Sequence, residues 1–435
     1  MVRLRMISSG RLTTLVLGCL ALLLVICIIV FPDQAFQSSL QGLTIWWKLV
    51  FPALLPFLII TEILRGMGIL HGLGALLEPL LRLLFKLPGI GGWAIAIGLT
   101  AGTPSGVIAV GGLRRDKLVT RSEAERLLTL SHVLSPVFLI TVVGVGFLQN
   151  AKAGLVLAIL HYGSVILIAI FQRFSYVRTI AEPEVVANRR AEARSQPRKG
   201  GLLNKSVAAL QKAQAADGRT FGKLLGDSVV LSVQHLMAVG GIIMIFSVLT
   251  HAVSISQIIP FTTMMLSNLG LDSASKLEQL LSTVMPGLFE AHLGAYTIGQ
   301  SLLFSDSWHY AVLSALFAWG GLSSHAQVKS FTLGTDIRYS AFLRTRLLHA
   351  IVAFVCTCAF WQPLVNWIEQ STSPVFRSVT NEASVGVNIN ELSLWSLLSP
   401  MMLWFCCIVI LMLFLSVFTA FAFRHNDLTP HNNKR

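Results

Sequence analysis

The sequence predicts an all-α, polytopic membrane protein with about eight spanning helices and two re-entrant hairpins, arranged as an inverted repeat. Three observations predict this class. Hydrophobic residues make up 54% of the 435 residues and charged residues only 12%. Apolar runs of about 20 residues, the length that crosses the hydrocarbon core of a bilayer, recur along the chain. Several runs are interrupted by Gly, Pro and Ser, and the same order of elements occurs twice.

The charge and cysteine content argue against other classes of protein. The formal net charge is +13, but the basic residues lie in short segments between apolar runs. This pattern follows the positive-inside rule of membrane topology, so no nucleic-acid partner is expected. All six cysteines fall inside apolar segments, where thiols behave as small hydrophobic groups. We therefore expect neither a disulfide framework, nor a metal site, nor a cofactor.

The first three elements are expected to be two spans and an interfacial helix. Leu12–Phe31 follows three arginines and lacks the small-residue cleavage site of a signal peptide, so residues 1–35 are interpreted as a retained anchor helix. Gly42–Leu64 returns to the cytoplasmic side. Leu70–Lys86 carries Glu, Arg and Lys among its leucines, which favours an amphipathic helix at the cytoplasmic interface.

A re-entrant hairpin and two spans follow. Trp93–Leu113 is interrupted at 102–106, and basic residues follow it at once, so both of its ends are expected on the cytoplasmic side. Leu127–Phe147 then runs outward with a break at Ser135-Pro136, and Gly154–Phe171 comes back. Such broken segments are tolerated in a membrane only where protein or a water-filled cavity surrounds them.

Residues 172–223 are rich in Lys and Arg and contain few apolar runs. They are expected to form a mobile cytoplasmic linker whose charge attracts the anionic lipid surface. A regulatory role for this basic run is the alternative to plain topology.

The second half repeats the plan in the opposite orientation. Leu224–Thr250 runs outward, and Ile255–Leu271 has the character of an interfacial helix. Leu277–Phe304 is interrupted at 286–292 and has few basic flanking residues, so it is expected to be a hairpin open to the outside. Tyr310–Val328 then runs inward with a break at 320–324.

Two spans complete the chain. Arg338, Arg344 and Arg346 are interpreted as cytoplasmic, after which Leu347–Trp367 exits and Leu394–Phe423 returns. Both termini are then cytoplasmic. The expected organisation is an anchor helix at 1–35, a first gate repeat at 36–171, the linker at 172–223, an inverted second gate repeat at 224–353, and C-terminal helices with an external loop and a cytoplasmic tail at 354–435.

Each break leaves unpaired N–H groups on one half-helix and unpaired carbonyls on the other, so a break at mid-bilayer can bind ions without a formal charge of its own. Small and hydroxyl residues at a break either contact a ligand or pack helices together, and the sequence leaves both roles open. The candidate solute-binding residues are Gly102, Thr103, Pro104, Ser105, Gly106, Ser135, Glu290, Ser323, Ser324 and Gln327.

Three ionisable residues are candidates for ion coupling or gating. Glu290 is a carboxylate deep in a predicted span, where ionisable groups are costly and commonly functional. His292 and His132 belong to the only residue type whose ordinary pKa lies near neutral pH. For all three, a structural hydrogen bond between helices is the alternative.

Enzyme signatures are absent from the sequence. It contains no H-E-x-x-H and no G-x-S-x-G, and Gly218–Lys223, the nearest approach to a phosphate-binding loop, continues with Leu224 instead of Ser or Thr. We therefore expect no enzyme and no ATP-driven motor, and transport that is ion-coupled or passive.

Five stretches in order resemble the sporulation integral membrane protein family, which carries two nucleoside-recognition gate domains and is related to concentrative nucleoside transporters. The similarity runs from Phe36 to Ala353. The stretches are LEPLLRLLFKLPGIGG (77–92), EAERLLTLSHVLSPVF (123–138), GLFEAHLG (287–294), AWGGLSSHAQVKS (318–330) and TDIRYSAFLRTRLLH (335–349).

The resemblance implies a role in spore formation, the movement of dipicolinate across the outer forespore membrane. It also implies that the hairpin tips and broken helices bind the solute, here at Gly102–Gly106, Ser135, Glu290 and Ser323–Gln327. Dipicolinate is a flat aromatic dianion, so helix N-termini would suit its carboxylates, and Trp319 or Phe289 its ring. The partners expected are thus a small anionic solute and membrane lipid, and related carriers are commonly homo-oligomers. A nucleoside or other organic-solute carrier, or a scaffold that does not transport, are the alternatives.

Overall fold

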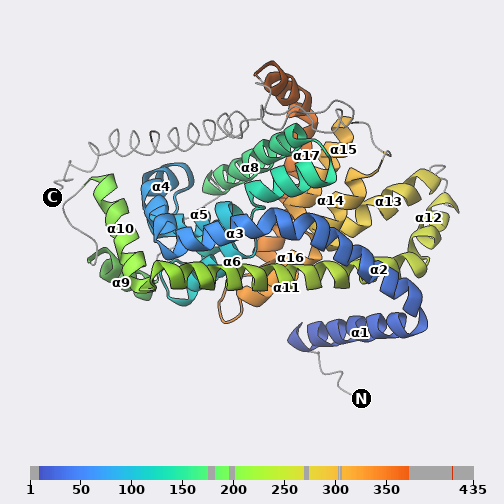
Figure 1. Cartoon of the computed structure of the whole chain (residues 1–435), viewed down its shortest axis with the longest axis horizontal. Coiled ribbons are helices and arrows are strands. Elements are labelled where there is room, and N and C mark those ends of the chain that lie inside the picture. The colour runs from blue at the N-terminus through green and yellow to red at the C-terminus, as the bar shows by residue number, and fades with distance from the viewer. Residues whose placement is uncertain are drawn as a thin grey trace, which may run out of the picture.

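A computed structural model describes residues 9–174, 182–194, 201–268, 274–301, 303, 306–371 and 414. Every regular element in this part of the chain is a helix, which confirms the all-α prediction (Figure 1). Four helical stretches there are long and apolar enough to cross a membrane, and a bent pair, Ile69–Phe85 with Gly89–Ala101, raises the number to five if it is one span. The four are Pro32–Gly66, Ala151–Phe174, Phe221–Ile255 and Tyr339–Ile368.

The N-terminal helices follow the predicted order with longer bounds. Helix α1 occupies the predicted anchor, and α2, a π-helical turn and α3 form one continuous rod, so the second predicted span begins earlier than expected. Helix α4 is the predicted amphipathic helix, and it buries Leu70, Leu77 and Leu81 on one face. The bounds are α1 Ser9–Val30, α2 Pro32–Ile45, the π-helix Trp46–Val50, α3 Phe51–Gly66 and α4 Ile69–Phe85.

The first hairpin and the first broken helix also form. Helix α7 begins at a capping box, in which Glu123 N donates to Thr120 Oγ1 and Thr120 N donates to the Glu123 carboxylate. It ends at Ser131, and the span resumes as a π-helix after Ser135. The bounds are α5 Gly92–Ala101, α6 Ser105–Arg115, α7 Arg121–Ser131, the π-helix Phe138–Phe147 and α8 Ala151–Phe174.

The segment predicted to be a mobile linker contains two packed helices, α9 Pro183–Arg194 and α10 Leu202–Asp217. Helix α10 lies along α4, where Ser206 Oγ donates to Gly72 O at 2.8 Å. These residues of the predicted linker are therefore helical and packed against the rest of the protein, which the sequence analysis did not anticipate. A basic composition masked helices that are stabilised by tertiary packing more than by their own apolar pattern.

The second half contains the predicted long helix, interfacial helix, hairpin, broken helix and long helix. The two arms of its hairpin touch, because a Cβ on Gly294 would lie 2.2 Å from Gly287 Cα. The predicted span Leu394–Phe423 lies outside the described residues. The bounds are α11 Phe221–Ile255, α12 Ile258–Asn268, α13 Ala274–Phe289, α14 Ala291–Gly299, α15 Asp306–Trp319, α16 Gly321–Phe331 and α17 Tyr339–Ser371.

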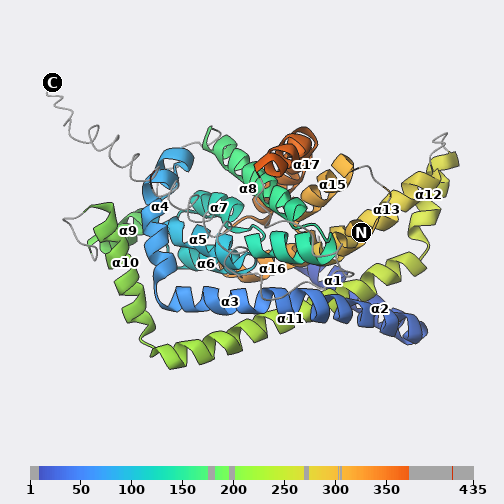
Figure 2. The ribbon, with the colours of Figure 1, turned by 45° about the horizontal axis from the view of Figure 1, so that its top comes forward.

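The long helices frame the broken ones. Helices α2 and α3 run beside α11 along one side of the molecule, and α8 crosses α17 on the opposite side (Figures 1 and 2). Helices α4, α9 and α10 lie at one end and α12 at the other. The four breaks therefore lie inside the protein, where the freed backbone groups have protein around them.

Candidate functional site

In the first half, the tip of the α5–α6 hairpin is seated on the break that follows α7. Gly102 adopts φ 73° and ψ −158°, a conformation open only to glycine, and a Cβ there would lie 3.0 Å from Ser135 N. Gly106 lies so close to Ser131 O that a Cβ would approach it to 2.1 Å. The small residues at this tip therefore permit a close backbone contact between hairpin and broken helix.

The second half repeats this contact. The break between α15 and α16 places Gly320 and Gly321 at φ 87° and 79°. A Cβ on Gly321 would lie 2.8 Å from Phe289 O and 3.0 Å from Glu290 N, which belong to the tip of the α13–α14 hairpin. Each hairpin tip thus touches the broken helix of its own half.

All four breaks meet at one small buried cavity of about 50 Å³. The first hairpin, the first break, the second hairpin and α16 each contribute to its wall, and α11 and α15 close it with apolar side chains. Its lining residues are Thr103, Pro104, His132, Leu134, Val239, Ile242, Glu290, Ala291, His292, Phe317, Gly320, Ser323, Ser324 and Gln327.

Most of the candidate residues predicted from the sequence line this cavity, namely Thr103, Pro104, His132, Glu290, His292, Ser323, Ser324 and Gln327. Others do not. The hydroxyl of Ser135 is buried and accepts a hydrogen bond from Phe138 N at 3.2 Å, so it caps the resumed helix. Gly102 and Gly106 serve the close contact described above, and Ser105 faces a second cavity. The phenyl ring in the lining of the small cavity is that of Phe317, and neither Trp319 nor Phe289 belongs to this lining.

Glu290 is the N-cap of α14 and only 4% exposed. Its carboxylate accepts hydrogen bonds from His292 N at 2.5 Å and from Leu293 N at 3.0 Å. The other carboxylate oxygen lies 2.7 Å from His292 Nδ1. Glu290 therefore faces the protein interior, as the cost of a lipid-facing carboxylate requires, and it compensates the positive end of α14.

Three other polar side chains of the cavity have no hydrogen-bond partner among the described residues. The side chains of Thr103, Ser323 and Gln327 make no hydrogen bond within the described part of the chain, whereas Ser324 Oγ donates to Gly321 O at 3.2 Å. Helices α6 and α16 also begin at this site without a side-chain cap. Hydroxyls, an amide and two uncapped helix N-termini thus surround the cavity, a set suited to an anionic or polar solute.

A second, larger cavity of about 860 Å³ lies on the other side of the first hairpin, between α3, α4, α10 and α11. Ala101 and Ser105 line it, while their neighbours Thr103 and Pro104 line the small cavity. The tip of the first hairpin therefore separates the two. The charged residues of the large cavity are five basic and three acidic: Arg65, Arg82, Arg189, Lys205, Lys212, Glu62, Glu78 and Asp116.

One charged residue near the small cavity escaped the sequence reasoning. Arg346, which was interpreted as a marker of the cytoplasmic side, is 1% exposed in α17 and contacts His132, one of the residues that line the cavity. The helix begins earlier than the predicted span Leu347–Trp367, because α17 starts at Tyr339 and holds the Arg346 side chain in the protein interior. The available signal was the spacing of Arg346 and His349, three residues apart on one helical face at the start of an apolar run.

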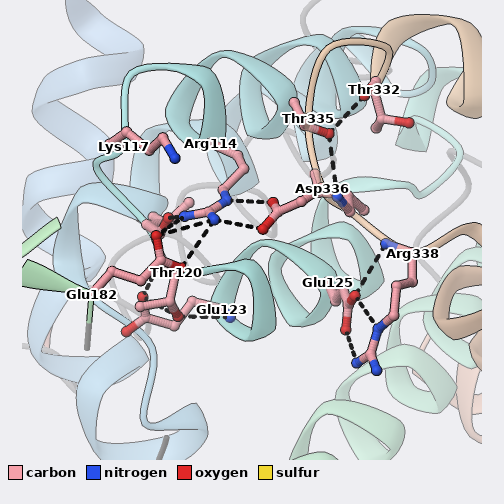
Figure 3. Close-up of polar contacts among 12 residues, drawn as sticks. Arg114, Lys117, Thr120, Glu123, Glu125, Glu182, Thr332, Thr335, Asp336 and Arg338 are labelled. Carbon is pink, nitrogen blue, oxygen red and sulfur yellow. Dashed lines mark hydrogen bonds and ion pairs between the residues drawn. The ribbon is translucent and has the colours of Figure 1, made fainter. Parts of the chain in front are cut away.

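A network of ion pairs ties the two halves together near the loop after α6 (Figure 3). Arg114 is almost fully buried, and both sides of its guanidinium meet carboxylates: Nε and Nη2 each lie 2.7 Å from Asp336, and Nη2 lies 3.0 Å from Glu182. Nη1 also donates to Val119 O at 2.9 Å. The hydrogen bonds from Arg114 hold the pKa of Asp336 below its ordinary value, and those same bonds raise the pKa of Arg114.

A second pair in the same region has the more exposed arginine. Arg338 follows Asp336 in the chain, and its guanidinium forms a bidentate pair with Glu125 at 2.8 Å for both contacts. Arg189 of α9 forms an ion pair with Glu123 and donates to Leu118 O at 2.8 Å. The loop after α6, the start of α9 and the loop before α17 are therefore held to one another by complementary charge.

Two comparisons with known proteins bear on these features. The Gate family, described as nucleoside recognition, matches residues 47–153, which contain the first hairpin and the first break. Over 394 residues the chain is 34% identical to the sporulation integral membrane protein YlbJ of Bacillus subtilis (strain 168). That match covers 90% of this chain and 92% of the relative.

Proposed function

Because the chain belongs to the sporulation integral membrane protein family, we propose that it is a secondary carrier of a small anionic organic solute. The resemblance found in the five sequence motifs is confirmed by the 34% identity over 90% of the chain. The solute that this resemblance implies is dipicolinate, moved across the outer forespore membrane during sporulation. We propose it as the substrate here.

The convergence of the four breaks carries the proposal. Two hairpin tips and two broken helices, from parts of the chain as distant as Thr103 and Gln327, meet at one polar cavity inside the helices. Irregular backbone inside a membrane protein is tolerated where it lines a cavity, and carriers use it to bind solutes near mid-bilayer. A scaffold that only recruits partners has no use for such a site.

The two halves are proposed to be inverted gate repeats, at 36–171 and 224–353. Matching elements make matching contacts: α3 packs on α11, α8 packs on α17, and each hairpin tip rests on its own broken helix. This pairing supports a two-fold relation between the halves. Repeats of this kind let one half rock against the other around a fixed site.

The small cavity, at about 50 Å³, holds no more than a few water molecules. We propose that a solute arrives through the cavity of about 860 Å³ and reaches Thr103 when the first hairpin shifts. The larger cavity carries more basic than acidic side chains, which raises the local concentration of an anion. Glu290, His292 and His132 are the proposed coupling and gating groups.

The proposed topology places both termini, the loop after Arg115 and residues 172–223 in the cytoplasm. The contacts of Arg114 and Arg189 support it, because they join segments that were all predicted to lie on that side. In a variant without native cysteines, cysteines at Ser195 and Ser384, both outside the described residues, should be labelled from opposite sides of the membrane. Equal labelling from the outside would refute this topology.

Transport into proteoliposomes tests the function directly. The purified protein should take up labelled dipicolinate and not labelled uridine, whereas a nucleoside carrier would show the reverse preference. Thermal unfolding separates a carrier from a scaffold, because a solute that binds only the folded state raises the unfolding midpoint, and the rise increases with the solute's concentration and affinity. Neither uptake nor stabilisation by any tested solute would refute the carrier proposal.

A further inference from the structure

Arg346 is only 1% exposed, yet it has no carboxylate partner within the described residues. Its Nη1 donates to His132 O at 2.9 Å and its Nη2 donates to Thr129 O at 3.2 Å. Both carbonyls belong to the C-terminal end of α7, where a cation is favourable. Two neutral carbonyls do not, however, neutralise a full charge in the protein interior.

The same guanidinium determines which nitrogen of His132 carries the proton. Arg346 Nη1 lies 3.3 Å from His132 Nδ1. Because a guanidinium has only donors, Nδ1 must be the acceptor, and the proton of the neutral ring is then on Nε2. His132 is 4% exposed and lines the small cavity, yet its Nε2 has no hydrogen-bond partner among the described residues.

The ring of His132 lies close to the break between α15 and α16. The His132 Cε1 atom, which is bonded to Nε2, lies 3.3 Å from the place that a Cβ on Gly320 would take. Gly320 and Ser324 line the same cavity. The His132 ring therefore belongs to the cavity wall, with a partnerless Nε2 on one side of Cε1 and the Arg346 guanidinium at the other ring nitrogen.

We infer that His132 and Arg346 together recognise a carboxylate of the solute, with His132 Nε2–H donating to a carboxylate oxygen and Arg346 supplying the compensating charge through the ring. This inference rests on the proposed function and assigns the charge recognition of that same site. Glu290, the carboxylate in the cavity wall, is already bound by two N–H groups of its own helix and by His292. A neutral nucleoside would leave Arg346 uncompensated, so the pair favours anions.

The rival role for Arg346 is purely structural, as a cap on α7, and charge selectivity distinguishes the two. Binding is measured as the rise in the unfolding midpoint of the purified protein with dipicolinate (two carboxylates), pyridine-2-carboxylate (one) and uridine (neutral). The test variants are Arg346→Gln, which removes the charge, and Arg346→Lys, which keeps it. The matched control is Arg344→Gln, an exposed arginine two residues earlier on the same helix.

A second pair of variants leaves Arg346 in place. In His132→Asn the amide oxygen takes the place of Nδ1 and the donor toward the cavity is lost. In His132→Gln the amide nitrogen takes the place of Nε2 and that donor is kept. We expect Arg346→Gln and His132→Asn to weaken dipicolinate binding roughly 10- to 100-fold. Arg344→Gln and His132→Gln should stay close to wild type, and no variant should change binding of uridine.

Each outcome decides the inference. Wild-type affinity for dipicolinate in both Arg346→Gln and His132→Asn would overturn it and leave the proposed carrier function intact. Wild-type protein that binds uridine but neither carboxylate would overturn both the anionic class and this inference. If Arg346→Gln does not fold, His132→Asn and Arg346→Lys carry the test. Loss of dipicolinate binding in Arg346→Lys, together with wild-type binding in His132→Asn, would then also overturn the inference.

Discussion

Arg114 and Arg346 are both buried in the described part of the chain, and their surroundings differ. Arg114, 4% exposed, has two carboxylates and a backbone carbonyl around its guanidinium. Arg346, 1% exposed, has two carbonyls and one imidazole nitrogen. The first charge is neutralised within the chain, whereas the second is not neutralised by any carboxylate among the described residues.

The difference separates a structural region from a site. A buried charge whose hydrogen bonds are all made holds the surrounding segments in one arrangement, here the loop after α6, the start of α9 and the loop before α17. A buried charge without a counter-ion carries a large desolvation cost that an incoming anion can lower. The polar groups around Arg346 should therefore govern solute binding, and those around Arg114 should govern stability.

The largest effect is expected at the cavity. Glu290→Gln keeps the size of the side chain and deletes its charge, so gradient-driven accumulation of solute should be abolished while exchange of solute across the membrane persists. The weaker N-cap should lower the free energy of unfolding by about 1 kcal/mol. Uptake and counterflow in proteoliposomes measure the two activities. Near-normal accumulation by a folded Glu290→Gln protein would show that the carboxylate holds no coupling ion.

The next effect concerns the network. Arg114→Gln leaves Asp336 and Glu182 without their partner, but both carboxylates are partly exposed and return to water, so the expected loss is about 2 kcal/mol of unfolding free energy. Affinity for the solute should stay within about twofold. The control is Arg338→Gln, because the Arg338 side chain is 52% exposed, so its loss should shift the unfolding midpoint far less. Selective loss of solute affinity in Arg114→Gln would contradict the separation of the two regions.

A smaller effect on stability is expected at the other buried arginine. Arg346→Met fills a similar volume without the cost of desolvating a charge, and such replacements are often neutral, so the change in unfolding free energy should be within about 1 kcal/mol. Thermal unfolding without solute, compared directly with Arg114→Gln, measures it. If Arg346→Met destabilises the protein more than Arg114→Gln does, Arg346 is chiefly a structural cap.

The smallest effect is the pH dependence of the network. Arg114 lowers the pKa of Asp336 in the folded protein. The stabilisation from this pair is therefore complete above the unfolded pKa of about 4, and it is lost as the pH falls through the lower folded pKa. The difference in unfolding midpoint between wild type and Asp336→Asn should be constant from pH 7 to about 5 and shrink below about 4. A difference that already vanishes at pH 6 would rule out this pair as its source.

The elements that were predictable from the sequence depend on local properties. Apolar length against bilayer thickness predicts the spans, and Gly and Pro predict the breaks, because a membrane helix must satisfy its own backbone. The four breaks, the amphipathic α4 and the second hairpin were found this way, and the motifs predicted the family. The helices α9 and α10 were missed, because their partners, among them α4, lie far away in the sequence.

What only the tertiary structure decided is which side chain faces which cavity. Thr103 and Ser105 are two residues apart, yet the turn at the hairpin tip directs one to the small cavity and the other to the large one. Arg346 stands just before the predicted span Leu347–Trp367, and only the packing of α17 brings it to His132, 214 positions earlier in the chain. In the same way, Arg114 meets Asp336 across 222 positions. Hydropathy and backbone requirements act within a segment and can be read along it, whereas the partner of a buried charge is set by packing between segments.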